Sequence, residues 1–129
     1  MQDDRLWGFE QSLWLEGREN YREKVDPEVV MVLPQPPFVL TGQDAIGAVM
    51  ATPVWDRAEL TERRVSRPQE GLIVVAYRVR AEKKDHPGYE AWCTSVFRRL
   101  EHEVWHVVQH QQTPVSTTET TAQASPAGR

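Results

Sequence analysis

The sequence predicts an α+β domain, a cone-shaped half-barrel in which a curled antiparallel meander sheet is closed by three N-terminal helices. Four strand-like runs follow one another between residues 54 and 113 and are joined by short turns. These runs are about eleven to fourteen residues long, well above the usual five or six, and strands of that length must twist and curl. Three upstream segments carry apolar helical faces, and these are the surfaces available to cover the concave side of such a sheet.

The first two helices are predicted from the spacing of their apolar residues and from their boundaries. Over residues 3–15, apolar side chains recur at three, four and seven positions, as on one helix face: Leu6, Trp7, Phe9, Leu13 and Trp14. Asp3 and Asp4 supply an N-terminal cap and favour the helix dipole. A second short helix covers residues 18–24, and Pro27 forces Asp26 out of helical geometry.

A short hairpin and a third helix come next. Residues 28–33 and 38–40 are the two strands of the hairpin, and the turn between them is rich in proline. Thr41 is expected to cap a helix over residues 43–50, and Pro53 ends that segment.

The four strands of the meander are predicted at residues 54–67, 72–82, 90–100 and 103–113. The second of them has an uninterrupted apolar face: Ile73, Val75, Tyr77, Val79 and Ala81. That face is expected to lie in the core. In the last two strands both parities carry apolar residues, so both faces need a cover.

Composition limits the class of protein. The chain has 129 residues and a formal net charge of -4, which gives no electrostatic reason to expect a nucleic-acid or membrane partner. No apolar run reaches the roughly 20 residues of a membrane span, and no signal peptide is recognisable, so a cytoplasmic protein is expected. The single cysteine, Cys93, is predicted to be buried. Residues 1–114 are expected to form the domain and residues 115–129, rich in Ser, Thr and Ala, a disordered tail.

Two stretches carry a resemblance to a known family. The order of elements and the run LTGQDAI at residues 40–46 resemble the SnoaL-like, ketosteroid-isomerase-like uncharacterised branch of the nuclear transport factor 2-like superfamily. The closing stretch, WHVV at residues 105–108 followed by HQQTP at 110–114, looks like the last strand of that branch. The superfamily hosts enzymes, binding proteins and interaction modules on one scaffold, so the resemblance implies a fold rather than one activity.

The resemblance also implies what an enzyme of this fold would need. Isomerases of the family use a tyrosine on the first helix and two carboxyl groups inside the cone. Here the first helix offers Trp14 in place of a tyrosine, and we expect no acid on the strands at 29–33 and 93–100. These departures argue against the isomerase mechanism. Epoxide-hydrolase relatives use an Asp-Arg-Asp set, but Asp56 and Arg57 are adjacent and so point to opposite faces of a strand.

Three residues are the candidates for acid/base chemistry. Glu59 lies in a strand and becomes a base if its face is concave, or pairs with an arginine across the strands if that face is convex. Tyr77 is expected to look into the cone, where its hydroxyl needs a partner. His106 is either a packed or dimer-facing residue or a general base. His102, His106 and His110 share one parity, but neighbours four apart are roughly 13 Å apart, too far to share a metal ion.

The sequence therefore leaves three functions open. The first is a small-molecule-binding protein whose pocket is lined by apolar, aromatic and histidine side chains. Its predicted ligand-binding residues are Trp14, Tyr21, Met31, Trp55, Trp92 and His110. The second is an isomerase-, cyclase- or hydrolase-type enzyme that needs no cofactor or metal, with Glu59, Tyr77 and His106 as its catalytic residues. The third is a partner-binding module whose cone is filled. A homodimer through the outer face of the meander is expected in each case.

Overall fold

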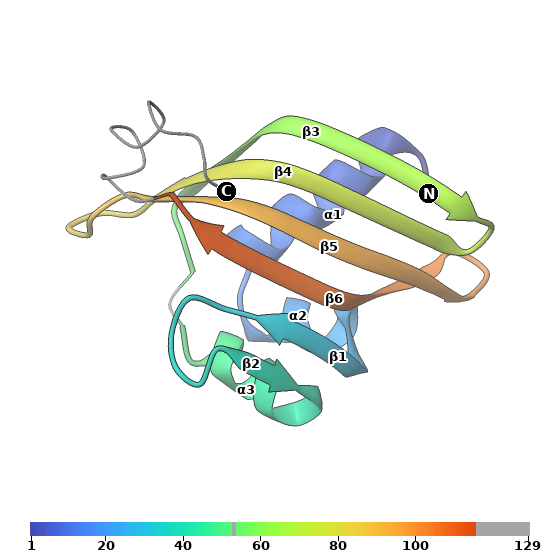
Figure 1. Ribbon diagram of the computed structural model, residues 1–129, viewed down its shortest axis with the longest axis horizontal. Helices are drawn as coiled ribbons and strands as arrows, with labels where there is room; N and C mark the ends of the chain where they lie inside the picture. The colour runs from blue at the N-terminus through green and yellow to red at the C-terminus, as the bar shows by residue number, and fades with distance from the viewer. Residues whose placement is uncertain (53, 116–129) are drawn as a thin grey trace, which may run out of the picture.

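The computed structural model describes residues 1–52 and 54–115, which form three helices and one six-stranded sheet (Figure 1). The helices are α1 (Asp3–Leu15), α2 (Arg18–Lys24) and α3 (Gly42–Met50), and the strands are β1 (Val25–Val32), β2 (Val39–Thr41), β3 (Arg57–Gln69), β4 (Leu72–Glu82), β5 (Tyr89–Glu101) and β6 (Val104–Pro114). The α+β class and the curled sheet are as predicted. The predicted tail lies outside the described residues, apart from Val115.

The sheet combines the predicted meander with the upstream hairpin, in the order β2-β1-β6-β5-β4-β3. Neighbouring strands are antiparallel except β1 and β6, which pair in parallel. The first strand starts at Val25, three residues before its predicted start, because Val25 already pairs with Val107 of β6. A register shift between Val25 and Val30 accommodates Pro27, which has no N–H to give to a ladder.

Helix α1 buries one face against the concave side of the sheet. Leu6, Glu10, Leu13 and Trp14, spaced as one helix face, are all buried. Asp3 and Asp4 lie in the first turn, where they complement the helix dipole, but the cap position is Gln2 and no side chain caps the helix. The predicted aspartate cap is therefore wrong.

Helix α3 starts without a side-chain cap as well. Thr41 occupies the cap position as expected but makes no capping hydrogen bond. Gly42 has a φ of 54°, and a Cβ added there would lie 3.2 Å from the carbonyl oxygen of Pro27. A glycine is needed at this position because the chain turns in a left-handed conformation close to the backbone of β1.

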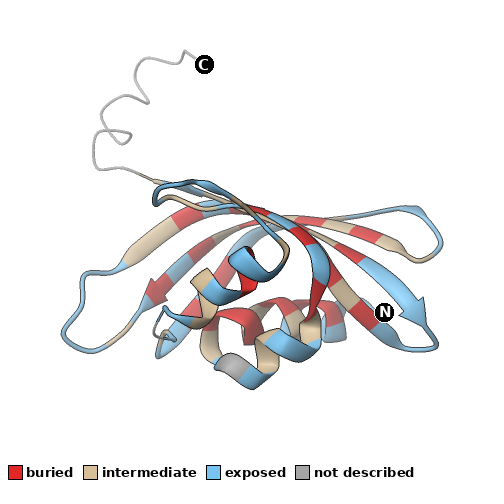
Figure 2. Cartoon of the chain, turned by 90° about the horizontal axis from the view of Figure 1, so that it is seen from below, coloured by how far each residue is buried: buried red, intermediate tan, exposed pale blue. Residues whose placement is uncertain are grey.

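The buried face of the sheet is the one that the helices cover, and red buried positions follow it along the strands in Figure 2. The alternation predicted for β4 is confirmed, since Ile73, Val75, Tyr77, Val79 and Ala81 are all buried. On β5 the same face carries Ala91, Cys93, Ser95 and Phe97, also buried. Each large apolar side chain in this layer stabilises the fold by roughly 1.5–3 kcal/mol.

A β-bulge in β6 decides which side chains reach the concave face. Phe97 of β5 pairs with Val107, but the preceding residue Val96 pairs with Gln109, so Val108 is an extra residue in β6. Residues before and after Val108 therefore follow opposite parities. His106 faces the outer side of the sheet, whereas His110 pairs with Ser95 and faces the concave side. The single parity predicted for the histidines of this strand is wrong for that reason.

Within residues 1–52 and 54–115, no helix is long and apolar enough to cross a membrane. The same residues contain no group of three His, Cys, Asp or Glu side chains arranged to hold a metal ion.

Candidate functional site

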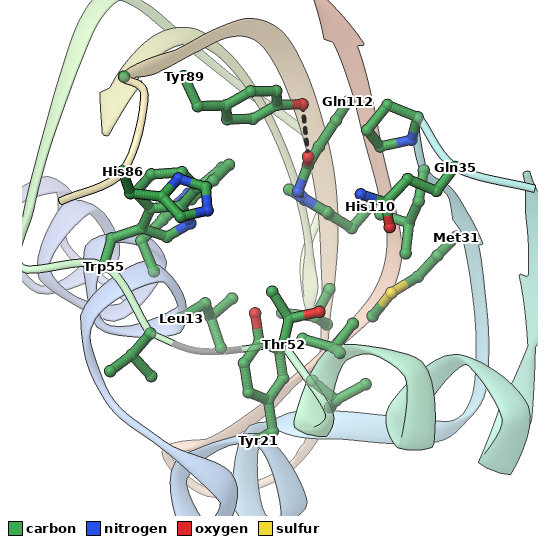
Figure 3. A pocket seen from close by; sticks show the side chains of 18 of the residues that line it. Leu13, Tyr21, Met31, Gln35, Thr52, Trp55, His86, Tyr89, His110 and Gln112 are labelled. Carbon is green, nitrogen blue, oxygen red and sulfur yellow. Dashed lines mark hydrogen bonds between the residues drawn. The ribbon is translucent and has the colours of Figure 1, made fainter. Parts of the chain in front are cut away.

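A cavity of about 360 Å³ lies between the concave face of the sheet and the helices (Figure 3). Side chains from α1, α2, β1, α3, β6 and the loops before β3 and β5 line it, and most of them are apolar or aromatic. They include Leu13, Trp14, Tyr21, Met31, Val49, Thr52, Trp55, His86, Tyr89, Val107, His110 and Gln112. Among the described lining residues none is Asp, Glu, Lys or Arg. The cavity is within the roughly 300–1,000 Å³ range of small-molecule sites.

Aromatic rings form one wall of the cavity. The Trp55 and Tyr89 rings stack with centroids 5.9 Å apart and an angle of 17° between their planes, and His86 meets Trp55 edge-on at 5.6 Å. Trp14 extends the wall, and its ring centroid is 6.2 Å from the ring centroids of both Tyr89 and His110. Such rings offer flat apolar surface that loses little side-chain entropy on binding.

A buried carboxyl group lies behind the cavity, in the core. Glu10 of α1 is fully buried, and its Oε2 accepts hydrogen bonds of 2.6 Å from the Tyr77 hydroxyl and 2.6 Å from the Ser95 hydroxyl. Trp14 donates its indole N–H to the same tyrosine at 3.0 Å. The other carboxyl oxygen, Oε1, is buried and has no hydrogen-bond partner among residues 1–52 and 54–115. Burying a carboxyl group without full hydrogen bonding destabilises the folded protein, and such groups cluster at functional sites.

Ser95 connects Glu10 to the cavity through His110. The Ser95 hydroxyl is 2.8 Å from Nδ1 of His110, and that nitrogen is 3.7 Å from Oε2 of Glu10. On the cavity side, Nε2 of His110 is 3.1 Å from the amide nitrogen of Gln112, whose oxygen accepts from the Tyr89 hydroxyl at 2.8 Å. Figure 3 shows the Tyr89–Gln112 bond at the cavity wall beside His110. A continuous polar chain therefore runs from the cavity to the buried acid.

Burial sets the protonation of this chain. Burial raises the pKa of Glu10, although the Ser95 and Tyr77 hydrogen bonds oppose the shift. Burial lowers the pKa of His110 to about 4, against a smaller raising effect of the Thr94 backbone. His110 is therefore a neutral imidazole at neutral pH, with one N–H and one acceptor nitrogen. The same burial raises the pKa values of Tyr21, Tyr77 and Cys93, which stay protonated.

Five of the six predicted ligand-binding residues are found at the wall of this cavity. Trp14, Tyr21, Met31, Trp55 and His110 all line the cavity. The Tyr77 hydroxyl has a hydrogen-bond partner, as predicted, and this partner is Glu10. The tyrosine lies in the core behind the cavity wall rather than in the cavity.

Trp92 and Glu59 do not reach the cavity. Trp92 is 39% exposed on the outer face of β5, where the guanidinium of Arg78 lies 5.0 Å from its ring. Glu59 is exposed on β3, in register with Arg80 across the strands. Both side chains point to the outer face of their strands, away from the cavity.

His106 belongs to a different cluster, on the outer face. Its Nδ1 is 3.3 Å from Oδ2 of Asp26, and the same oxygen accepts from Nε and Nη2 of Arg98 at 3.1 and 2.8 Å. Oδ1 accepts the backbone N–H of Glu28 at 2.8 Å. Asp26 is only 1% exposed, and its pKa is lowered because these bonds together outweigh burial, which is the largest single influence. This cluster joins β1 to β5 and β6, and its side chains do not line the cavity on the concave face.

Sequence reasoning missed Glu10, Ser95, Gln112 and Tyr89. Glu10 could have been found, because it lies four residues after Leu6 and four before Trp14, in the middle of the apolar face of α1. An acid within an apolar helix face is buried with partners or is part of a site. Ser95 could also have been found, because it shares the parity of Cys93 and Phe97 on β5. The face taken by Gln112 depends on the bulge in β6, which the sequence does not mark.

Comparisons with known proteins show the fold. No protein-family model matches the chain, and no curated protein matches its sequence. A candidate ketosteroid isomerase from Parabacteroides distasonis superposes with a TM-score of 0.74 at 18% identity, covering 88% of this chain and 87% of that one. A nuclear transport factor 2-like protein of unknown function in nutrient uptake from Rhodospirillum rubrum gives 0.73 at 16%, with coverages of 89% and 100%.

A third solved structure, the CamKII hub homology domain of Chlamydamonas reinhardtii, gives a TM-score of 0.68 at 16% identity and covers 88% of this chain and 94% of that one. The predicted resemblance is thereby confirmed for the fold, which is that of nuclear transport factor 2-like and ketosteroid isomerase-like proteins. At these identities the likeness carries no activity.

Proposed function

We propose that the protein binds a small, uncharged, largely apolar molecule in the cavity between the sheet and the helices. The observation that carries this proposal is the composition of the wall: aromatic and aliphatic side chains, no charged lining residue among those described, and a few convergent polar groups. Small-molecule sites combine these features, in which apolar area supplies affinity and a few polar groups fix orientation. A filled domain that only assembles with partners would not need a cavity of about 360 Å³.

A binding experiment with a neutral fluorescent probe tests this proposal. N-phenyl-1-naphthylamine should show a saturable rise in fluorescence with the wild-type protein. Val49→Phe adds volume at the cavity wall and should weaken binding about tenfold or more, since an occupied cavity has no room for the probe. Val65→Phe is the matched control, because Val65 is also half-buried but does not line the cavity. Equal affinity in both variants would contradict the proposal.

An acid/base enzyme is the second candidate, and the Glu10–Ser95–His110 chain favours it. In this reaction Nε2 of His110 takes a proton from a carbon next to a ligand carbonyl, leaving an enolate. The Nδ1 proton passes to Ser95, and the proton of Ser95 passes to Glu10, so that one proton is gained by the buried acid. Glu10 and His110 thus take the place of the predicted catalytic residues Glu59 and His106, which lie outside the cavity.

The acid/base hypothesis is tested by following hydrogen–deuterium exchange at the carbon next to the carbonyl of 2-decalone. The wild-type protein in D₂O should speed exchange next to the carbonyl, followed by NMR, and His110→Gln should abolish that effect. His106→Gln changes the same residue type on the opposite face of the same strand and should leave the rate unchanged. Exchange no faster than in buffer would leave the protein as a binder without this chemistry.

We also propose that a second copy of the chain covers the outer face of β1, β5 and β6. Val30, Val32, Trp92, Leu100 and Val104 leave large apolar surface exposed there. Some proteins of this fold are hub domains, which is compatible with such an assembly. Val30→Glu should shift a dimer to monomer in light scattering, whereas Val54→Glu, similarly exposed but at the cavity, should not. A wild-type monomer at micromolar concentration would refute this assembly.

A further inference from the structure

Ser95 has one hydrogen to share between two acceptors, and this fixes the tautomer of His110. When Glu10 is ionised, the Ser95 hydroxyl donates to Oε2 of Glu10 at 2.6 Å. Nδ1 of His110, 2.8 Å from the same hydroxyl oxygen, must then donate to it. Nε2, which faces Gln112 at the cavity wall, is left as an acceptor. The amide nitrogen of Gln112 at 3.1 Å is a donor and fits this state.

One added proton reverses the chain. A proton that arrives at Nε2 of His110 lets Nδ1 release its own proton to Ser95, and Ser95 releases its hydrogen to Oε2 of Glu10. The result is a neutral Glu10, an intact Ser95 hydroxyl that now donates to Nδ1, and a neutral His110 whose Nε2 carries the hydrogen. While the cavity is empty, Gln112 turns its amide so that its oxygen faces Nε2 and its nitrogen faces Tyr89. Because Nε2 has a single hydrogen or lone pair, a ligand that bonds to it takes the place of Gln112 there.

Among the described residues, the other titratable groups that face Glu10 do not change their protonation with it. The titratable side chains facing it from the neighbouring elements are Tyr21 of α2, Tyr77 of β4 and Cys93 of β5, and burial raises the pKa of each, so all three stay protonated. Burial also keeps His110 uncharged in both states. At the mouth of the cavity, His86 packs on Trp55 and the Lys83 ammonium lies 4.5 Å from the centroid of the same ring.

We propose that the cavity recognises an uncharged apolar molecule through a hydroxyl or a carbonyl group, and that the single proton held by Glu10 decides whether Nε2 of His110 accepts from the hydroxyl or donates to the carbonyl. An alcohol satisfies both states because a hydroxyl both donates and accepts. A ketone only accepts, so it is matched only when Glu10 holds the proton. This inference rests on the proposed function of the cavity and adds the chemistry of its ligand.

The matched pair 2-decalol and 2-decalone tests the inference, because the two differ at one oxygen and neither titrates between about pH 5 and about pH 9. Calorimetric titration should show the ketone losing about tenfold in affinity relative to the alcohol as pH rises, since a buried carbonyl is left without a donor. The direction follows from Glu10, whose pKa is raised by burial above the ordinary 4.5.

Two variants locate the effect, and a third is the control. Glu10→Gln removes the titrating group and Ser95→Ala removes the link, so in both the ratio of alcohol to ketone affinity should become independent of pH. His106→Gln, on the outer face, should keep the wild-type dependence. Circular dichroism confirms that each variant is folded before it is used.

The outcomes separate the two proposals. If both compounds bind with a ratio that does not change with pH, the inference fails while the binding function stands. A pH-dependent ratio that persists in Ser95→Ala also overturns it, because the proton would then not pass through Ser95. If neither compound binds at any pH, while N-phenyl-1-naphthylamine does, the ligand class is wrong. Failure of all three probes removes the binding function itself.

Discussion

Each side of the sheet buries one carboxylate next to a histidine of β6, and the two sites treat the acid in opposite ways. On the outer face, the carboxylate of Asp26 contacts Arg98, His106 and the backbone N–H of Glu28, and these contacts lower its pKa. On the concave face, Glu10 receives only neutral hydroxyl donors, and burial raises its pKa. A cation beside a carboxylate makes a structural link, whereas a carboxylate without one is left able to take up a proton.

Replacing Asp26 should have the largest effect on stability. Asp26→Asn removes the charge that Arg98 and His106 both contact and places an amide where an acceptor is needed. We expect the free energy of unfolding to fall by about 2–3 kcal/mol, the scale of hydrogen bonds to a charged group. Urea denaturation at neutral pH measures it.

The exposed pair Arg57–Glu82, with its charged atoms 3.7 Å apart, supplies the control for that experiment. Glu82→Gln should change stability by less than about 0.5 kcal/mol, as is usual for surface ion pairs. If Asp26→Asn costs no more than Glu82→Gln, the outer cluster is not the structural link that its geometry indicates.

The parallel between the two sites explains what could be predicted from the sequence. The apolar run on β4 and the helix spacing of α1 identified the layers, because each follows one unbroken period. The site depends on β6, in which the alternation of side chains between the two faces is interrupted. Val108 adds one residue to β6, and this sends His106 and His110, which are four residues apart, to opposite faces. Nothing in the run WHVVQH marks the extra residue, so strand parity alone places both histidines on one face of the sheet.

The pH dependence of stability should distinguish the acids. An acid with a raised pKa in the folded state holds a proton that the unfolded chain has lost, so Glu10 makes stability fall as pH rises above about 4.5. Asp26, with a lowered pKa, makes stability fall as pH drops below about 3.8. Each contributes a slope of at most about 1.4 kcal/mol per pH unit.

His110 contributes a slope of the opposite sign between about pH 4 and pH 6.5, because the unfolded chain takes up a proton there before the folded one does. This slope is common to wild type and variants. Glu10→Gln removes only the contribution of Glu10, so its free energy of unfolding should rise relative to that of wild type as pH rises, in urea denaturation at a series of pH values. A difference that stays constant with pH would mean that Glu10 has no raised pKa.

The smallest effect expected compares two buried tryptophans. Trp14 donates its indole N–H to Tyr77 and so supports the Glu10 network, whereas the buried indole nitrogen of Trp105 has no hydrogen-bond partner in the part of the chain that the structure describes. Trp14→Phe should cost about 1 kcal/mol more than Trp105→Phe, since only the former breaks a hydrogen bond. Equal losses in thermal unfolding would indicate that the indole–tyrosine bond adds nothing to the network.

An NMR measurement of the ring nitrogens of the two histidines of β6 tests most directly whether the ligand binds on the concave face. We expect that His110 stays neutral down to about pH 4, and that 2-decalol shifts the Nε2 resonance of His110 while leaving His106 unchanged. At a pH where Glu10 is ionised, the ring hydrogen of His110 should reside on Nδ1. If His110 titrates like a free histidine, or if the ligand moves His106 instead, the assignment of ligand chemistry to the concave face is contradicted.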